Sequence, residues 1–255
     1  MPLLIALLLG VVEGLTEYLP VSSTGHLVLV ARLLHRQAGS FEIVIQFGAI
    51  LAVVVHYRAL LVDHLRRRDT RLFVSLLVGF VPVAIIGKLA GHAIKDHLFF
   101  PRPIAIALAV GGVVMIAVER IRKNAKTLDG LEHVTPMRAF YIGLGQCFAL
   151  FPGASRSMCT IVTGQLTGLS TATAAEFSFL LGIPTLGAAC LYEGLKSRHE
   201  LAHDIGGASM AVGLVTSFFV AWAVVATFLR YLKSHGLSPF GWYRILLAIA
   251  VLKFM

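Results

Sequence analysis

Residues 13–26, EGLTEYLPVSSTGH, decide the fold of this chain. They include two carboxylates, one imidazole and three consecutive hydroxyl side chains, yet apolar residues surround them at 3–12 and 27–31. Ionisable side chains at membrane depth cost several kcal/mol and usually mark a functional site. The stretch is therefore the first candidate for the chemistry of this protein.

The spacing within this stretch predicts a helix, a break and a second helix. Glu13 and Glu17 are four residues apart, so they share one helix face. Pro20 ends that helix, because it lacks a backbone donor and biases the residue before it toward an extended conformation. The hydroxyl side chains at 22–24 are suited to cap the second helix, whose free N–H groups attract anions. His26 lies within the first turn of that helix.

The composition is that of an integral membrane protein. Of the 255 residues, 57% are hydrophobic and 14% are charged, whereas about a quarter are charged in a soluble domain. The N-terminus has no basic region followed by a small-residue cleavage site, so we expect no signal peptide. The net charge of +9 comes from Lys and Arg in short connections between apolar runs. This pattern is typical of topogenic loops, and we expect no nucleic-acid partner.

The second half of the chain repeats the hydropathy pattern of the first. Each half opens with an interrupted apolar segment and continues with three apolar runs, and the polar loop 121–137 separates the halves. We therefore predict a single membrane domain, 1–255, made of repeat one at 1–120 and repeat two at 138–255. At an offset of 132 to 134 the matched pairs are Pro20 with Pro152, Ser23 with Ser155, Glu42 with Glu176 and Gly48 with Gly182.

An odd number of full spans in each repeat predicts that the two repeats have inverted topologies. The expected fold is an all-α polytopic membrane protein with about six full transmembrane helices and two broken re-entrant helix pairs. The densest basic connections, 58–71 and 120–138, fall on one side, which the positive-inside rule makes cytoplasmic. Both termini and the connection 193–206 then lie outside.

The second break reads FPGASRSMCT, residues 151–160, and contains the strongest single candidate, Arg156. A guanidinium beside Ser155, Ser157 and Thr160 can donate two parallel hydrogen bonds to phosphate oxygens. Two broken segments that meet at the midplane would also bring two helix N-termini together, which favours an anion. The alternative is a purely structural Arg156, paired with Glu13, Glu17 or Glu176.

The motifs EGLTEYLPVSSTGHL (13–27) and PGASRSMCT (152–160) together resemble the undecaprenyl-diphosphate phosphatase family of the bacitracin-resistance type. Residues 41–55 and 174–184 are also similar to that family, so the resemblance spans nearly the whole chain. It implies a multi-pass enzyme of the bacterial inner (cytoplasmic) membrane whose active site opens to the periplasmic side. The family's catalytic positions fall on Glu13, Glu17, Ser23, His26 and Arg156.

The implied reaction is hydrolysis of undecaprenyl diphosphate to undecaprenyl phosphate and inorganic phosphate at the outer leaflet. It recycles the lipid carrier of peptidoglycan synthesis and confers bacitracin resistance. The expected partners are this lipid substrate and the bilayer, with a homodimer as a further candidate.

The residues themselves also favour cleavage of a phosphoanhydride. Charge spreads over the transferring phosphoryl oxygens, so positioning and electrostatic stabilisation carry most of the catalysis. We expect Ser23 to be the nucleophile and His26 its general base. The alternative is that Ser23 only caps a helix, with water or His26 as nucleophile. The expected substrate-binding residues are Ser22, Thr24, Gly153, Ser155, Ser157, Thr160 and Gln46.

Two carboxylates repel a diphosphate unless their charge is countered. We therefore expect Glu13 and Glu17 to hold a divalent cation, Mg²⁺ or Ca²⁺, through hard oxygen ligands. Protonation of one carboxylate through burial is the alternative. For the function as a whole, the alternatives are a secondary transporter or lipid flippase, since inverted repeats with broken helices are typical of that class, and a non-enzymatic subunit that binds the lipid carrier.

Overall fold

The computed structural model describes residues 1–34, 39–98, 100–197, 199 and 205–254. Helices make up nearly all of the regular structure in these residues, and no named strand occurs there. The prediction of an all-α protein is confirmed.

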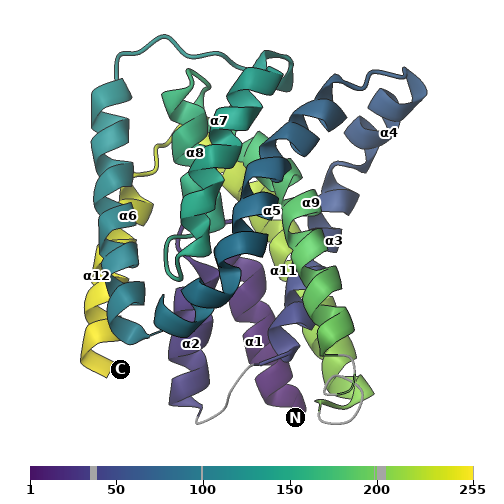
Figure 1. The fold of residues 1–255 in the computed structure, drawn as a ribbon, viewed down its shortest axis with the longest axis vertical. Helices are drawn as coiled ribbons and strands as arrows, with labels where there is room; N and C mark the ends of the chain where they lie inside the picture. The colour runs from purple at the N-terminus through teal and green to yellow at the C-terminus, as the bar shows by residue number, and fades with distance from the viewer. Residues whose placement is uncertain (35–38, 99, 198, 200–204, 255) are drawn as a thin grey trace.

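The first half contains one broken helix pair and three longer segments (Figure 1). The pair consists of α1 and α2, which contact each other. Pro20 lies in the break between them, as predicted. The helices are α1 (Leu3–Thr16), α2 (Ser23–Leu33), α3 (Phe41–His56), α4 (Arg58–Arg66), α5 (Arg71–Leu98) and α6 (Pro101–Arg122).

The second half follows the same plan. Its broken pair consists of α7 and α8, joined through a short 3-10 turn and the sequence around Pro152. Three long helices follow. The elements are η1 (Leu131–His133), α7 (Pro136–Cys147), η2 (Phe148–Leu150), α8 (Arg156–Leu166), α9 (Thr171–Lys196), α11 (Gly207–Leu232) and α12 (Ser238–Phe254).

The two broken pairs enter from opposite ends of the molecule. In Figure 1, α1 and α2 occupy the lower half, next to both termini, whereas α7 and α8 occupy the upper half. The basic connections 58–71 and 120–138 both lie at the upper end. The predicted inverted arrangement of the helix pairs is therefore present, while the division into repeats at 121–137 stays a prediction.

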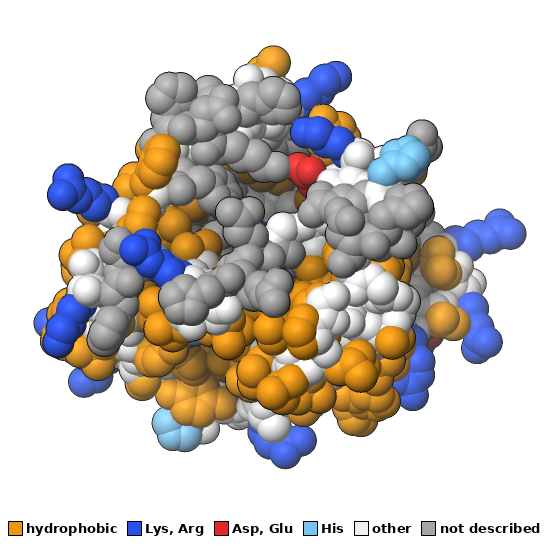
Figure 2. All heavy atoms as spheres, turned by 90° about the horizontal axis from the view of Figure 1, so that it is seen from below, with side chains coloured by type: hydrophobic (Ala, Val, Ile, Leu, Met, Phe, Trp, Pro, Cys, Tyr) orange, Lys and Arg blue, Asp and Glu red, His pale blue; other side chains and the backbone are white. Residues whose placement is uncertain are grey.

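Among the described residues, four helices are long and apolar enough to cross a membrane: α5 (over Arg71–Gly91), α6, α9 and α11. The bent pair α3–α4, with an angle of 58°, adds a fifth candidate. The remaining expected span, α12, has 17 residues, which at about 1.5 Å per residue is slightly short of the roughly 30 Å hydrocarbon core. The chain is thus a multi-pass membrane protein. Figure 2 looks onto the end that carries the termini, and hydrophobic side chains cover much of the lower half of this view.

Small residues allow close approach between the long helices. A Cβ added at Gly14 of α1 would lie 2.8 Å from the carbonyl oxygen of Ser217 in α11, and one at Gly143 of α7 would overlap the carbonyl of Gly79 in α5. Close backbone contact of this kind is characteristic of helix packing in membranes, where lipid tails remove the hydrophobic drive between helices. These contacts fix the broken pairs against the long helices.

Candidate active site

The second helix of each broken pair begins in the same unusual way. Ser22 caps α2 and Ser155 caps α8, and both have a φ of 73°, a left-handed conformation that is uncommon outside glycine. Each serine hydroxyl accepts a hydrogen bond from a backbone N–H three residues ahead, at 3.3 Å in both cases. The geometry therefore pairs Ser22 with Ser155, one residue away from the pairing that the sequence match predicts.

This register places Ser23 and Arg156 at equivalent positions, each as the first residue of its helix. Positive φ at a non-glycine residue costs about 1–3 kcal/mol and is concentrated at functional sites. Two such caps at the two breaks leave two helix N-termini at the centre of the fold, each with free N–H groups.

One carboxylate connects the two breaks. Oε1 of Glu17 accepts a hydrogen bond from Nη2 of Arg156 at 3.0 Å, and its Oε2 accepts one from the hydroxyl of Ser23 at 2.7 Å. The ion pair is buried, with side-chain exposures of 5% for the glutamate and 9% for the arginine. Glu17 thus connects Ser23, the predicted nucleophile in one break, to Arg156, the predicted phosphate-binding residue in the other.

The Arg156 guanidinium is held by contacts to α9 and to Tyr18 in addition to its ion pair with Glu17. Its Nη1 donates to the carbonyl of Ser178 at 2.9 Å, and its Cζ lies 5.3 Å from the centre of the Tyr18 ring. Gly182 leaves the room for it, since an added Cβ there would lie 3.1 to 3.2 Å from the guanidinium atoms. The buried Nε has no hydrogen-bond partner among the described residues.

A polar cavity of about 170 Å³ lies where the two breaks meet. Apolar side chains of α9 and of the second break complete its wall. The predicted site residues that line it are Glu17, Ser22, Ser23, Thr24, Gln46, Gly153, Ser155 and Arg156.

Three predicted site residues lie behind this cavity wall. Glu13 is 1% exposed, and its Oε2 has no hydrogen-bond partner within the described parts of the chain. Ser157 donates to the carbonyl of Leu19 at 2.8 Å, which joins the second break directly to the first. Thr160 donates to the carbonyl of Arg156 at 2.8 Å. The hydroxyls of Ser157 and Thr160 therefore support the site from within the protein.

His26 is turned toward α12 and away from Ser23. Its Nδ1 lies 2.8 Å from the carbonyl of Ser22, and its Nε2 lies 2.6 Å from the hydroxyl of Tyr243. A carbonyl only accepts, so Nδ1 carries the hydrogen and Nε2 accepts from the tyrosine. The hydrogen bond expected between His26 and Ser23 is replaced by the one between Ser23 and Glu17.

Arg244 is a site-adjacent residue that the sequence interpretation missed. It is fully buried in α12 and donates hydrogen bonds to backbone carbonyls of both breaks. The signal was present, because Arg244 lies in the apolar run 239–255, and a charge in such a run indicates function by the same argument that singled out Arg156.

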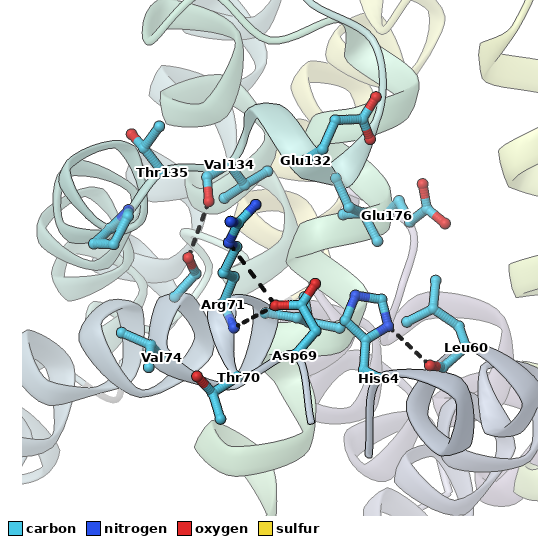
Figure 3. Close-up of a pocket in the computed structure, with 14 residues that line it drawn as sticks. Leu60, His64, Asp69, Thr70, Arg71, Val74, Glu132, Val134, Thr135 and Glu176 are labelled. Atoms are coloured by element: carbon cyan, nitrogen blue, oxygen red, sulfur yellow. Dashed lines mark hydrogen bonds and ion pairs between the residues drawn. The ribbon is translucent and has the colours of Figure 1, made fainter. Parts of the chain in front are cut away.

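A larger cavity, of about 630 Å³, lies away from the breaks, between α4, the start of α5, η1 and α9 (Figure 3). The ionisable side chains labelled there include His64, Asp69, Arg71, Glu132 and Glu176. None of the predicted catalytic or substrate-binding residues lines it. Of the predicted catalytic residues, Glu17, Ser23 and Arg156 line the smaller cavity instead.

These features define a class: a multi-pass α-helical membrane protein in which two oppositely directed broken helix pairs present a serine, a glutamate and an arginine to one buried polar cavity. A family model described as bacitracin resistance protein BacA matches residues 6–250. The chain belongs to this family.

Curated relatives agree along the whole chain. An undecaprenyl-diphosphatase of Sorangium cellulosum is 55% identical, over 97% of this chain and 84% of the relative. Proteins of the same name from Acidovorax ebreus and Caldanaerobacter subterraneus subsp. tengcongensis are 46% and 44% identical, over 98% and 97% of this chain and 94% of each relative. The family and the class of enzyme predicted from the two motifs are confirmed.

Proposed function

We propose that this protein hydrolyses undecaprenyl diphosphate to undecaprenyl phosphate and inorganic phosphate. The observation that carries the proposal is the position of Glu17, whose two carboxylate oxygens bind the Ser23 hydroxyl and the Arg156 guanidinium at the edge of one cavity. Hydrolysis needs a nucleophile and cationic donors at the same phosphorus, and these side chains supply both.

In the proposed reaction, the Ser23 hydroxyl attacks the terminal phosphorus and its proton passes to Glu17, 2.7 Å away. The bond from that phosphorus to the bridging oxygen breaks, and undecaprenyl phosphate leaves. Water then hydrolyses the phosphoserine and releases inorganic phosphate. Glu17 takes the place of the general base for which His26 was predicted, because His26 is bound to Ser22 and Tyr243.

Arg156 and the two helix N-termini stabilise the charge that develops on the phosphoryl oxygens. The Nη1 and Nη2 atoms of Arg156 already donate hydrogen bonds to Ser178 and Glu17, whereas the buried Nε–H has no partner among the described residues. The planar set of donors in a guanidinium matches the geometry of phosphate oxygens. Ser22, Thr24, Ser155 and the backbone at Gly153 border the same cavity and provide further donors for the diphosphate.

A divalent cation, Mg²⁺ or Ca²⁺, held by Glu13 and Glu17 is part of the proposal. The buried Oε2 of Glu13 has no hydrogen-bond partner among the described residues and could ligate a cation. Both oxygens of Glu17 are bound by Ser23 and Arg156, so a cation would replace one of these contacts. No group of three or more metal-binding side chains exists among the described residues, so diphosphate oxygens would complete the coordination. When bound, the cation would neutralise charge on the diphosphate.

Removing the cation tests this part of the proposal. Thorough chelation should abolish phosphate release, added Mg²⁺ or Ca²⁺ should restore it, and Glu13→Gln should raise the cation concentration needed for half-maximal rate. Full activity after chelation, unchanged by either cation, would refute the metal role.

The proposed location is the bacterial inner membrane, with the cavity open to the periplasmic side. The basic connections 58–71 and 120–138 share the upper end of the fold, which the positive-inside rule makes cytoplasmic. The cavity is lined by Gln46 from the first half of α3 and by Leu186 from the second half of α9. The start of α3 and the end of α9 lie at the opposite end of the fold, where the termini are. Cysteine labelling at 58–71 and 120–138 from opposite faces of the membrane would contradict this orientation.

Recycling of the lipid carrier and resistance to bacitracin would follow from this activity. A homodimer stays a prediction that light scattering of the purified protein can check. The direct test of the function is release of inorganic phosphate from undecaprenyl diphosphate by purified protein, with Ser23→Ala as the control. A lipid flippase, which the oppositely directed half-helices would also suit, would move the lipid between leaflets and release no phosphate.

A further inference from the structure

Arg244 carries a second guanidinium into the centre of the fold. It lies within α12, is 0% exposed, and is the largest fully buried side chain among the described residues. The ion pairs formed among the described residues do not include it. A buried charge is tolerated only when it is paired or fully hydrogen-bonded, so its carbonyl partners must satisfy it.

Those partners come from three separate segments. In α6, Nε donates to the carbonyl of Leu108 at 3.3 Å and Nη2 to that of Ala107 at 3.2 Å. In the first break, Nη1 donates to the carbonyl of Pro20 at 3.1 Å. In the second break, Nη2 donates to the carbonyls of Gly153 and Ala154, both at 3.0 Å. One rigid planar group therefore ties both breaks to α6.

The contacts to the two breaks are symmetric in register. Pro20 lies three residues before Ser23, and Gly153 lies three residues before Arg156. Ser23 and Arg156 are the first residues of α2 and α8. In each break, Arg244 thus binds a carbonyl that lies three residues before the side chain used in the proposed reaction.

We propose that Arg244 is a positioning residue for the phosphatase reaction, which sets the separation of the two helix N-termini so that Ser23 and Arg156 face one phosphoryl group. This inference rests on the proposed function. Phosphoryl transfer depends mainly on positioning, and a displacement of about 1 Å costs on the order of 100-fold in rate. The arrangement uses all three nitrogens of the side chain, and only a guanidinium holds three donor nitrogens in one fixed plane.

Gly111 of α6 provides an independent way to disturb the same contact. A Cβ added at Gly111 would overlap Nη2 of Arg244 and lie 2.9 Å from its Cζ. Gly111→Ala therefore displaces the guanidinium while its charge and all catalytic side chains are kept. Gly91→Ala is the matched control, because nothing lies within 4 Å of the added carbon.

The experiment compares Arg244→Lys, Gly111→Ala and Gly91→Ala with the natural protein. We expect kcat per folded molecule to fall about 100-fold in Arg244→Lys and to fall in Gly111→Ala, with KM changed less than about threefold. Gly91→Ala should keep the natural kcat. Lysine keeps the charge but cannot reach carbonyls of three segments. If Arg244 served only to supply a positive charge or to aid membrane insertion, Arg244→Lys would keep the natural kcat.

Hydrogen exchange measured by mass spectrometry supplies a readout that is independent of activity. Loss of the shared contact should speed exchange at the amides of 19–26 and 152–159 in Arg244→Lys and Gly111→Ala, and leave the middle of α11 unchanged. A folded Arg244→Lys with natural kcat, or natural exchange at both breaks, would overturn the inference. A natural protein that releases no phosphate would refute the proposed function instead, and the exchange data would then decide whether Arg244 positions the breaks.

Discussion

Glu17 and Arg156 form a buried ion pair at 3.0 Å although 139 residues separate them in the chain. Each belongs to a different break, so the pair exists only when the two broken helix pairs meet. Removing one partner of a buried ion pair leaves an uncompensated charge, which typically costs about 3–5 kcal/mol. This contact therefore couples the stability of the central fold to the assembly of the site.

We expect Glu17→Gln to lose nearly all phosphatase activity and to unfold at a lower temperature. The amide cannot take the proton of Ser23, and it leaves Arg156 without a counter-charge. The measurements are phosphate release per folded molecule and the midpoint of thermal unfolding in detergent. Natural activity in Glu17→Gln would remove this residue from the mechanism.

Ser23→Ala should fold normally and be inactive, because it deletes the hydroxyl that Glu17 binds at 2.7 Å. During turnover of the natural protein, acid quenching and mass spectrometry should detect phosphate on the peptide that contains Ser23. A phosphorylated His26, or an active Ser23→Ala, would show that the serine only caps α2.

Gly182→Ala should reduce turnover about tenfold, because the added carbon lies 3.1 to 3.2 Å from the Arg156 guanidinium and displaces it. Gly187→Ala, in the same helix, is the control, since no heavy atom lies within 4 Å of its added carbon. Equal kinetic constants for these two variants would mean that the site tolerates movement of Arg156.

The sequence was sufficient to predict the breaks, because proline and hydroxyl residues inside apolar runs have direct consequences for the backbone. It also identified Arg156 and Glu17, since a charge at membrane depth is costly wherever its partner lies. The register between the breaks was misjudged by one residue, because three consecutive hydroxyls at 22–24 offer alternative caps. Only the left-handed φ shared by Ser22 and Ser155 resolves it.

The partner of His26 could not be predicted from spacing. Ser23 and His26 are one turn apart on α2, yet the imidazole binds Tyr243, which is 217 residues further along. Arg244 illustrates the same limit: its charge is visible in the sequence, but its acceptors are backbone carbonyls of three segments, which carry no side-chain signal. Contacts of this kind depend on how α12 packs against the breaks.

Hydrolysis of a lipid diphosphate at this site should depend on Arg156, and a comparison of two proteins tests this directly. Inorganic phosphate released from undecaprenyl diphosphate is measured for the natural protein and for Arg156→Lys, per molecule that elutes as folded protein in size-exclusion chromatography. We predict release by the natural protein and a loss of about 100-fold in Arg156→Lys, because lysine keeps the charge but lacks the forked donors. A well-folded Arg156→Lys with natural turnover would show that Arg156 is not needed for the reaction, and a natural protein that releases no phosphate would refute the phosphatase function.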